Sequence, residues 1–475
     1  MNPSDYLAED AVGLAELIAT REVSAAEALE AALAQLEAVN PKINAVTRVM
    51  ADQARAAVKA GAPAGPLGGV PYLIKDLGAQ IAGTPTTLGS RLFKDAVPAA
   101  DSAIVSAYRR GGLVIFGKTN TPELGLEPVT EPALFGPSRN PWDLARTPGG
   151  SSGGAAAAVA GGIVPAAHAS DGGGSIRIPA SCCGLFGMKP SRGRVSFAPA
   201  AEGWGGFSIQ HAVTRSVRDS AVLLDMVCAP QGGDPYRIEA PRTPFATDAE
   251  RDPGRLRIGF MTGGLAIEVI DPQCAQAVRD AARLCESLGH TVEEAVLPGD
   301  AGAMGAAAGT VIAASVAATL DAEAAKRGRP IETGEIEDVT AAMYQRGQGV
   351  SGSVYVQALQ AAHAYGRALA GFFEQYDVLL LSTLGSPPIP VGALRGDPPD
   401  LAGYTERLFA FMPNTQAFNV TGQPAMSVPL AMSAEGLPIG LQFVGRMAEE
   451  GLLFRLAGQL ERAAPWVGRR APTSA

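Results

Sequence analysis

The chain has 475 residues, of which 47% are hydrophobic and 18% are charged, and its net charge at pH 7 is -9. This composition is that of a globular protein with an ample core. The length allows one large domain or two or three of the usual size of about 100–200 residues. An acidic chain without a clustered basic stretch lacks a face that binds phosphates, which argues against nucleic acid as a main partner.

The N-terminal sequence MNPSDYLAEDAVG is acidic and polar, and it lacks the basic and apolar regions of a secretory signal, so a cytoplasmic protein is expected. The five cysteines include no CxxC pair, and their odd number means that they cannot all form disulfides within the chain, which suits a reducing compartment. Adjacent Cys182 and Cys183 are interpreted as small buried residues, with a redox pair as the alternative. The four histidines show no metal-ligand spacing, so no metal is expected.

The N-terminal region, about residues 1–65, is expected to be helical. Ser24 and Glu27 have the spacing of a capping box, in which two side chains satisfy free N–H groups at a helix start. Apolar residues then recur on one stripe, so an amphipathic helix is predicted from Ser24 to Val39. Asn40-Pro41 is expected to end this helix, because proline interrupts helical hydrogen bonding.

The next segments alternate between predicted strands and predicted helices. Residues 70–76 and 113–117 are apolar runs of strand length, and a helix is predicted over 101–110 between them. The pattern returns downstream, with a strand at 256–260 and a helix over about 272–288. This alternation is typical of a parallel sheet covered by helices.

The remaining third of the chain predicts mainly helices and a hairpin. Residues 301–375 are expected to be largely helical. Within them, residues 301–320 carry no charge and approach the length of a membrane span, about 20 residues. Most of these residues are Ala, Gly, Ser or Thr, so a buried, close-packed helix is favoured over a membrane helix. Residues 425–445 form two alternating runs about Glu435-Gly436, which predicts a hairpin.

Two glycine clusters, GGSSGG at 149–154 and GGGS at 172–175, each contain serine. The first has the composition of a flexible linker, but it continues into AAAAVA, which places it at a helix start with free N–H groups. Neither cluster matches a P-loop or a dinucleotide fingerprint. GGGS is suited instead to donating backbone N–H groups to a developing oxyanion, with Ser175 as the nucleophile.

A nucleophilic serine needs a base. The nearest histidine, His168, lies seven residues before Ser175, and the nucleophile-elbow pattern is absent. A lysine can replace histidine when burial lowers its pKa from the ordinary value of about 10.4. Lys75 lies on the apolar run VPYLIKD, with Asp76 expected on the opposite face because strand side chains alternate. From its spacing alone, a surface lysine is the alternative interpretation.

Four segments together resemble the amidase signature hydrolases: PYLIKD, PGGSSGG, DGGGSIRIPASCCGLFGMKPSRGR and GLPIGLQFVG. They lie in order and span most of the chain. The resemblance implies an α/β fold, a single α/β/α sandwich domain over residues 1–475 with a mixed, mostly parallel central sheet covered by helices. It also implies a helical substrate-side region at about 301–375 and, often, a homodimer. Within this family the chain closely resembles nylon-oligomer hydrolases, which open the 6-aminohexanoate cyclic dimer.

The resemblance implies a Ser-cis-Ser-Lys triad. It assigns Ser175 as the nucleophile, Ser151 as the bridging serine and Lys75 as the base. In this arrangement Ser151 takes the proton from Ser175 and passes its own to the neutral amine of Lys75. The two glycine clusters then serve one proton relay, which favours a site over a linker and a base over a surface lysine.

The resemblance also implies an oxyanion hole, which would consist of the backbone N–H groups of Gly172, Gly173, Gly174 and Ser175. Asp171 and Arg177 are implied as a scaffold pair that fixes this loop. Where the family commonly has a side chain after the aspartate, this chain has Gly172, so a looser loop is expected.

The function implied by the resemblance is hydrolysis of amide bonds through an acyl-enzyme, without a cofactor. The expected partners are small-molecule substrates: linear or cyclic amides, anilides, carbamates and esters, with neither nucleic acid nor membrane. The segments 123–135 and 301–320 are expected near the site. The same signature occurs in amidotransferase subunits that act on misacylated tRNA within a complex, and this is the alternative function. A non-catalytic binding protein is a third possibility, which the presence of all three triad residues disfavours.

Overall fold

One sheet of eleven strands runs through the molecule. The computed structural model describes residues 1–61, 64–398 and 400–474 of the chain. Residues 62–63 of the expected N-terminal region lie outside the described part, as do residues 399 and 475. The strands, in chain order, are β1 (Val46–Val49), β2 (Pro71–Lys75), β3 (Val114–Thr119), β4 (Ala166–Asp171), β5 (Phe186–Lys189), β6 (Ile209–Thr214), β7 (Arg257–Phe260), β8 (Thr291–Glu294), β9 (Val378–Ser382), β10 (Ala425–Met432) and β11 (Pro438–Val444).

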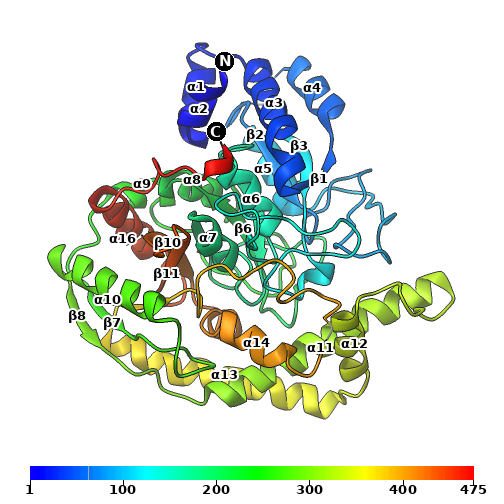
Figure 1. Ribbon diagram of the computed structural model, residues 1–475, viewed down its shortest axis with the longest axis vertical. Helices are drawn as coiled ribbons and strands as arrows, with labels where there is room; N and C mark the ends of the chain where they lie inside the picture. The colour runs from blue at the N-terminus through cyan, green and yellow to red at the C-terminus, as the bar shows by residue number, and fades with distance from the viewer. Residues whose placement is uncertain (62–63, 399, 475) are drawn as a thin grey trace.

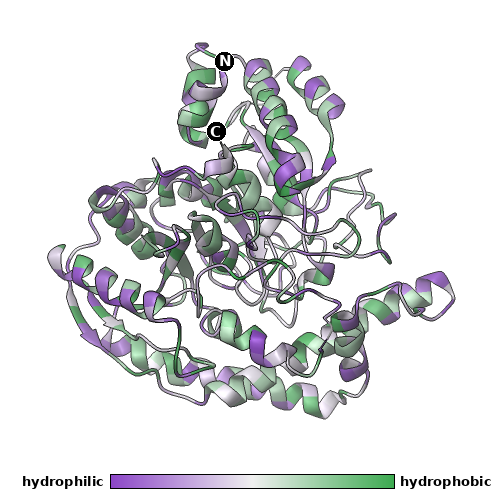
Figure 2. Cartoon of the chain, viewed as in Figure 1, coloured by the Kyte–Doolittle hydropathy of each residue, from purple (hydrophilic) through white to green (hydrophobic). Residues whose placement is uncertain are grey.

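Sixteen α-helices in the described residues surround this sheet (Figure 1), which confirms the expected α/β/α sandwich. They are α1 (Pro3–Ala8), α2 (Ala11–Ala19), α3 (Ala25–Ile43), α4 (Ala51–Lys59), α5 (Ala103–Arg110), α6 (Gly153–Ala160), α7 (Arg177–Cys183), α8 (Val217–Val227), α9 (Phe245–Glu250), α10 (Pro272–Ser287), α11 (Ala301–Arg327), α12 (Asp338–Gln348), α13 (Gly352–Gln375), α14 (Tyr404–Phe411), α15 (Ala417–Val420) and α16 (Glu450–Ala463). Figure 2 shows hydrophilic and hydrophobic residues alternating along outer helices such as α3 and α10.

The strand order is β1-β3-β2-β4-β6-β5-β10-β11-β9-β7-β8. Six of the ten neighbouring pairs are antiparallel and four are parallel, so the sheet is mixed, as expected, but the expectation that it is mostly parallel is wrong. The parallel pairs form two groups, β3-β2-β4 and β9-β7-β8. Between these groups lies the predicted hairpin of β10 and β11, and such directly joined strands must be antiparallel.

Helix α3 begins as predicted and ends later than predicted. Its capping box is present at Ser24 and Glu27, but the helix continues through Pro41 and ends at Ile43, followed by the C-cap Asn44 with a φ of 48°. Proline in the last turn removes one N–H donor without ending the helix. The Asn44 N–H donates to the Asn40 carbonyl at 2.8 Å, and the Asn40 side chain accepts from the next two N–H groups. These bonds stabilise the later helix end.

The predicted helical region over 301–375 consists of α11, α12 and α13, which lie along one edge of the molecule (Figure 1). By length and composition α11 is the one described helix that could cross a membrane, yet half of its most apolar stretch is buried within the fold. It packs against both α12 and α13. The interpretation of residues 301–320 as a packed helix is therefore confirmed.

The sheet places two strand ends side by side. Strands β2 and β4 are parallel neighbours, with Leu73 opposite Ala167, so their C-terminal ends meet. Strand β2 ends at Lys75 and β4 ends at Asp171. In α/β sheets, ligands bind beyond the carboxyl ends of parallel strands. Helix α6 begins within the first glycine cluster, at Gly153, and helix α7, which contacts α6, begins just after the second cluster.

The contact between α11 and α12 depends on a glycine. A Cβ atom on Gly347 would overlap the carbonyl group of Ala313. Gly347→Ala is therefore expected to lower the free energy of unfolding by about 1–3 kcal/mol, the usual cost of overpacking. Urea unfolding followed by circular dichroism measures this change.

Gly371→Ala is the matched control, because Gly371 lies in α13 with open space at its Cβ position. The alanine there is expected to stabilise the protein by about 0.5–1 kcal/mol through its higher helix propensity. Equal stability of the two variants would contradict the assigned packing.

Candidate active site

The side chain of Lys75 ends between two serines. Its Nζ lies 2.7 Å from Ser151 Oγ and 3.0 Å from Ser170 Oγ. The side chain is fully buried, and this burial lowers the pKa of Lys75 from 10.5 to about 7, against the opposing effect of the Asp171 charge. A large fraction of such an amine is neutral at neutral pH and able to accept a proton.

Asp76 points away from this cluster, as strand alternation predicted. Its carboxylate lies 2.6 Å from Lys118 Nζ and accepts a hydrogen bond from the Thr87 hydroxyl. Asp76 therefore forms a separate buried ion pair. The side-chain amine of Lys75 is left with the two serine hydroxyls as its hydrogen-bond partners among the described residues.

Ser151 lies in the first glycine cluster, whose six residues are all buried. The peptide bond between Gly150 and Ser151 is cis. A Cβ atom on Gly150 would overlap the backbone of Val129, and one on Gly154 would lie 2.5 Å from the Asn120 nitrogen. The glycines of this cluster are therefore required by close backbone approach, and the linker interpretation is wrong.

The second cluster forms a loop between β4 and α7. The Gly174 N–H donates to Asp171 Oδ1 at 2.7 Å. The expectation that this N–H group faces a substrate oxygen is therefore wrong, because the buried carboxylate binds it. Within the described part of the chain, the N–H groups of Gly172, Gly173 and Ser175 have no acceptor, so three of the four expected donors are free.

The loop is held by a buried ion pair. Arg177 donates to both carboxylate oxygens of Asp171 at 2.9 Å, and neither side chain is exposed. Although burial alone raises the pKa of Asp171, the Arg177 charge and the hydrogen bonds hold it well below its ordinary value. The guanidinium also donates to the Thr415 carbonyl and to the side chains of Gln442 and Asn419. These bonds join the loop to α15 and β11.

The structure gives no sign of the looser loop expected at Gly172. A Cβ atom there would lie 2.7 Å from the Trp204 ring, so the indole occupies the space of a side chain. The Thr415 hydroxyl donates to the Gly173 carbonyl at 2.6 Å, and the Asn419 side chain donates to the Asp171 carbonyl at 2.9 Å. The loop is therefore anchored on both sides.

Ser175 lies at the wall of a cavity of about 560 Å³. Its residue exposure is 9%, and within the described residues its hydroxyl makes no hydrogen bond, to Ser151 or to any other group. Hydrogen bonds between catalytic groups are often long in a free enzyme. The hydroxyl of Ser175 is therefore available to a molecule in the cavity.

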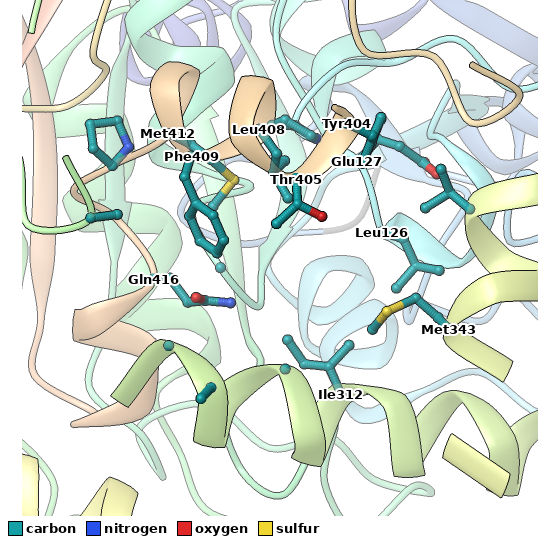
Figure 3. A pocket seen from close by; sticks show the side chains of 18 of the residues that line it. Leu126, Glu127, Ile312, Met343, Tyr404, Thr405, Leu408, Phe409, Met412 and Gln416 are labelled. Atoms are coloured by element: carbon teal, nitrogen blue, oxygen red, sulfur yellow. The ribbon is translucent and has the colours of Figure 1, made fainter. Parts of the chain in front are cut away.

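The cavity walls combine expected and unexpected segments. The expected segments 123–135 and 301–320 contribute Leu126, Glu127 and Ile312 (Figure 3). Helix α12, which lies within the predicted substrate-side region 301–375, also lines the cavity, whereas no motif predicted the contribution of α14. Most labelled side chains are apolar, and they are Leu126, Ile312, Met343, Leu408, Phe409 and Met412. The cavity thus suits a largely apolar small molecule.

The remaining titratable candidates form no hydrogen bond to the hydroxyls of Ser151, Ser170 or Ser175 within the described residues. His168 Nδ1 accepts a hydrogen bond from the backbone nitrogen of Lys75, and burial lowers its pKa to about 3, so this imidazole is neutral. Cys182 and Cys183 are buried, as predicted, and burial raises the pKa of both thiols. Within the described ranges, no group of three His, Cys, Asp or Glu side chains is placed to hold a metal ion.

Sequence comparison identifies relatives over the whole chain. Residues 27–454 match the family model described as Amidase. The chain is 37% identical to the 6-aminohexanoate-cyclic-dimer hydrolase of Paenarthrobacter ureafaciens, over 97% of this chain and 96% of that protein.

Two solved structures are similar to this one. The structure of 6-aminohexanoate cyclic dimer hydrolase complexed with substrate has a TM-score of 0.92 and 36% identity, covering 99% of this chain and 100% of that one. A bacterial aryl acylamidase of the amidase signature family has a TM-score of 0.87 and 30% identity, covering 97% of this chain and 99% of that one. This chain therefore belongs to the amidase signature family of amide hydrolases.

Proposed function

We propose that this protein is a cytoplasmic hydrolase that cleaves small-molecule amides through an acyl-enzyme on Ser175, with Ser151 and Lys75 as the proton relay. The observation that carries the proposal is the contact of 2.7 Å between Ser151 Oγ and the buried Lys75 Nζ. A lysine held with a pKa near neutrality is the kind of base that activates a serine.

The first half-reaction begins with neutral Lys75. Its amine takes the Ser151 proton as Ser151 takes the proton of Ser175, and Ser175 Oγ attacks the substrate carbonyl carbon. The carbonyl oxygen becomes negative and accepts hydrogen bonds from the free N–H groups of the loop, those of Gly172, Gly173 and Ser175. The C–N bond then breaks, and the departing amine receives the proton that returns from Lys75 through Ser151.

The second half-reaction releases the acid. Water attacks the acyl carbon and gives a proton to the relay, so Lys75 is again protonated through Ser151. The tetrahedral intermediate collapses, the bond to Ser175 Oγ breaks, and Ser175 recovers its proton along the same path. The enzyme returns to its starting protonation state, and water has been added across the amide bond.

The relatives and the cavity support amides with an apolar body as substrates. The relatives named above act on the 6-aminohexanoate cyclic dimer or are aryl acylamidases. The cavity has room for a linear or cyclic amide or an anilide, with apolar walls on several sides. Carbamates and esters share the attacked carbonyl, so we include them in the proposed range.

Ser175→Ala is expected to abolish turnover of an anilide, and Lys75→Met to lower kcat by at least about a thousandfold, because the relay acts as a unit. Release of the aniline, followed spectroscopically with the isolated protein, measures both variants.

Ser181→Ala is the matched control, because this buried serine of α7 accepts the Gly440 N–H and does not line the cavity. It is expected to stay within about threefold of the wild-type rate. More than about a tenth of wild-type activity in Ser175→Ala would exclude Ser175 as the nucleophile.

The pH dependence follows from the lowered pKa of Lys75. Below its pKa, about 7, the amine is protonated and unable to accept the Ser151 proton, so kcat/KM is expected to fall about tenfold per pH unit. Above about pH 8 the rate is expected to level off. A pH–rate profile measures this change, and EDTA is expected to leave it unaltered. A flat profile from about pH 5 to 8 would contradict a lysine base.

The reaction range is tested with a matched anilide, aryl carbamate and aryl ester. All three form an oxyanion at the same carbonyl position, so each is expected to acylate Ser175. An aryl leaving group needs less protonation than an alkylamine, so the aryl substrates are expected to react faster than the corresponding alkylamides. Transfer of each acyl group to hydroxylamine measures acyl-enzyme formation. Reaction with the anilide alone would restrict the enzyme to amides.

A further inference from the structure

Four glutamates gather behind one wall of the cavity. Three of them, Glu123, Glu131 and Glu337, accept hydrogen bonds from neighbouring groups. Glu123 accepts from the Ser90 hydroxyl at 2.6 Å and from the Glu337 N–H at 2.7 Å. Each of these three carboxyls is thus fixed to the protein by at least one donor.

Glu127 differs from the other three. Its side chain lines the cavity, beside Leu126 and Tyr404 (Figure 3). The residue is 2% exposed, and neither carboxyl oxygen has a hydrogen-bond partner among the described residues. A buried polar group without a partner costs free energy, so this carboxyl is poised for a partner that enters the cavity.

Carboxyls dominate the charges around Glu127. Glu337, Glu123 and Glu131 exert the largest charge effects on its pKa, and Arg346 is a cation that lines the same cavity. Burial, followed by these three carboxyls, raises its pKa well above the ordinary value. A protonated carboxyl has one donor and one acceptor, and an amide or carbamate group presents the complementary pair.

Glu127 is also close to the reacting groups. A Cβ atom on Gly125 would lie 3.2 Å from Ser151 Oγ, and Glu127 follows two residues later. Two residues of chain span at most about 7 Å. Ser175 and Glu127 line the same cavity, so one small molecule can contact both.

We propose that Glu127 recognises a second amide or carbamate group of the substrate, remote from the bond that is cleaved. Its carboxyl donates one hydrogen bond to the carbonyl oxygen of that group and accepts one from its N–H. The substrate class is then a molecule with two amide-type groups joined by a short, apolar spacer. This inference rests on the proposed function, in which Ser175 attacks the other carbonyl.

The test uses two anilides that differ only in whether a remote amide is present or replaced by two methylene groups. Equilibrium binding to Ser175→Ala, measured by calorimetry, gives the affinity ratio of the pair without any turnover. The diamide is expected to bind at least about tenfold more tightly. Glu127→Leu in this background is expected to remove most of that preference, whereas Glu127→Gln, which also donates and accepts, is expected to keep it within about threefold.

Glu131→Gln is the matched control, because it removes a carboxyl of the same cluster that does not line the cavity. It is expected to leave the ratio unchanged. If Glu127→Leu does not fold, Glu127→Met takes its place. The affinity ratio of the Glu127→Gln variant is measured in either case. In the active enzyme, the same preference is expected in KM rather than kcat.

Three results would overturn the proposal: no preference for the diamide, a preference unchanged in Glu127→Leu, or a preference lost in Glu127→Gln. The last would indicate an ionised carboxylate that binds an ammonium group, which an amino-anilide tests directly. Failure of the proposed function is distinguishable, because it would show as absent turnover of both anilides while binding to Ser175→Ala still reports on Glu127.

Discussion

The buried ion pair of Asp171 and Arg177 is the interaction on which the site depends. Its two charges are fully removed from water, which is favourable only when the remaining donors and acceptors are also satisfied. The Arg177 guanidinium donates its remaining hydrogen bonds to groups in and just before α15 and in β11. The Asp171 carboxylate accepts hydrogen bonds from two N–H groups of the loop that follows β4. One pair therefore fixes both the strand that ends at Asp171 and the loop that carries Ser175. Loss of either partner would leave an unpaired charge at the centre of the sheet.

The same aspartate also affects the pKa of Lys75, the proposed base. Burial lowers the pKa of Lys75, and the negative charge of Asp171 opposes this effect, so the amine has a pKa near neutrality instead of a still lower one. Arg177 in turn balances Asp171, which limits how far the carboxylate can raise the pKa of Lys75. The parallel pairing of β2 with β4 brings these groups together. Fold and proton affinity are thus coupled through three residues.

Some features of the site were predictable because their signals are local. Lys75 ends an apolar strand, and the glycines around Ser151 mark a close backbone approach. Both features can be predicted from short segments of sequence. Strand β4, with the sequence AAHASD, has weak strand propensity, and its pairing with β2 and β6 overrides that preference. Ser170, which contacts Lys75, could be found only once this pairing was known. The antiparallel centre of the sheet and the cavity wall from α14 depend on segments far apart in the chain, which no local pattern records.

The cavity collects polar groups that the fold leaves without partners. The Ser175 hydroxyl and three N–H groups of its loop lack acceptors or donors within the described residues, and Glu127 is the one buried carboxyl described with neither oxygen bound. Elsewhere the buried charges of Asp76 with Lys118, and of Asp171 with Arg177, are paired. Other buried polar atoms, such as Thr119 Oγ1 and Gln210 Nε2, also lack a partner in the part of the chain that the structure describes, but they do not line the cavity. Because unpaired buried groups reduce stability, the Ser175 hydroxyl and the Glu127 carboxyl are the unpaired groups that a ligand in this cavity can complete. The apolar walls supply contact area, and in the proposed function these few polar groups select the carbonyl that reacts.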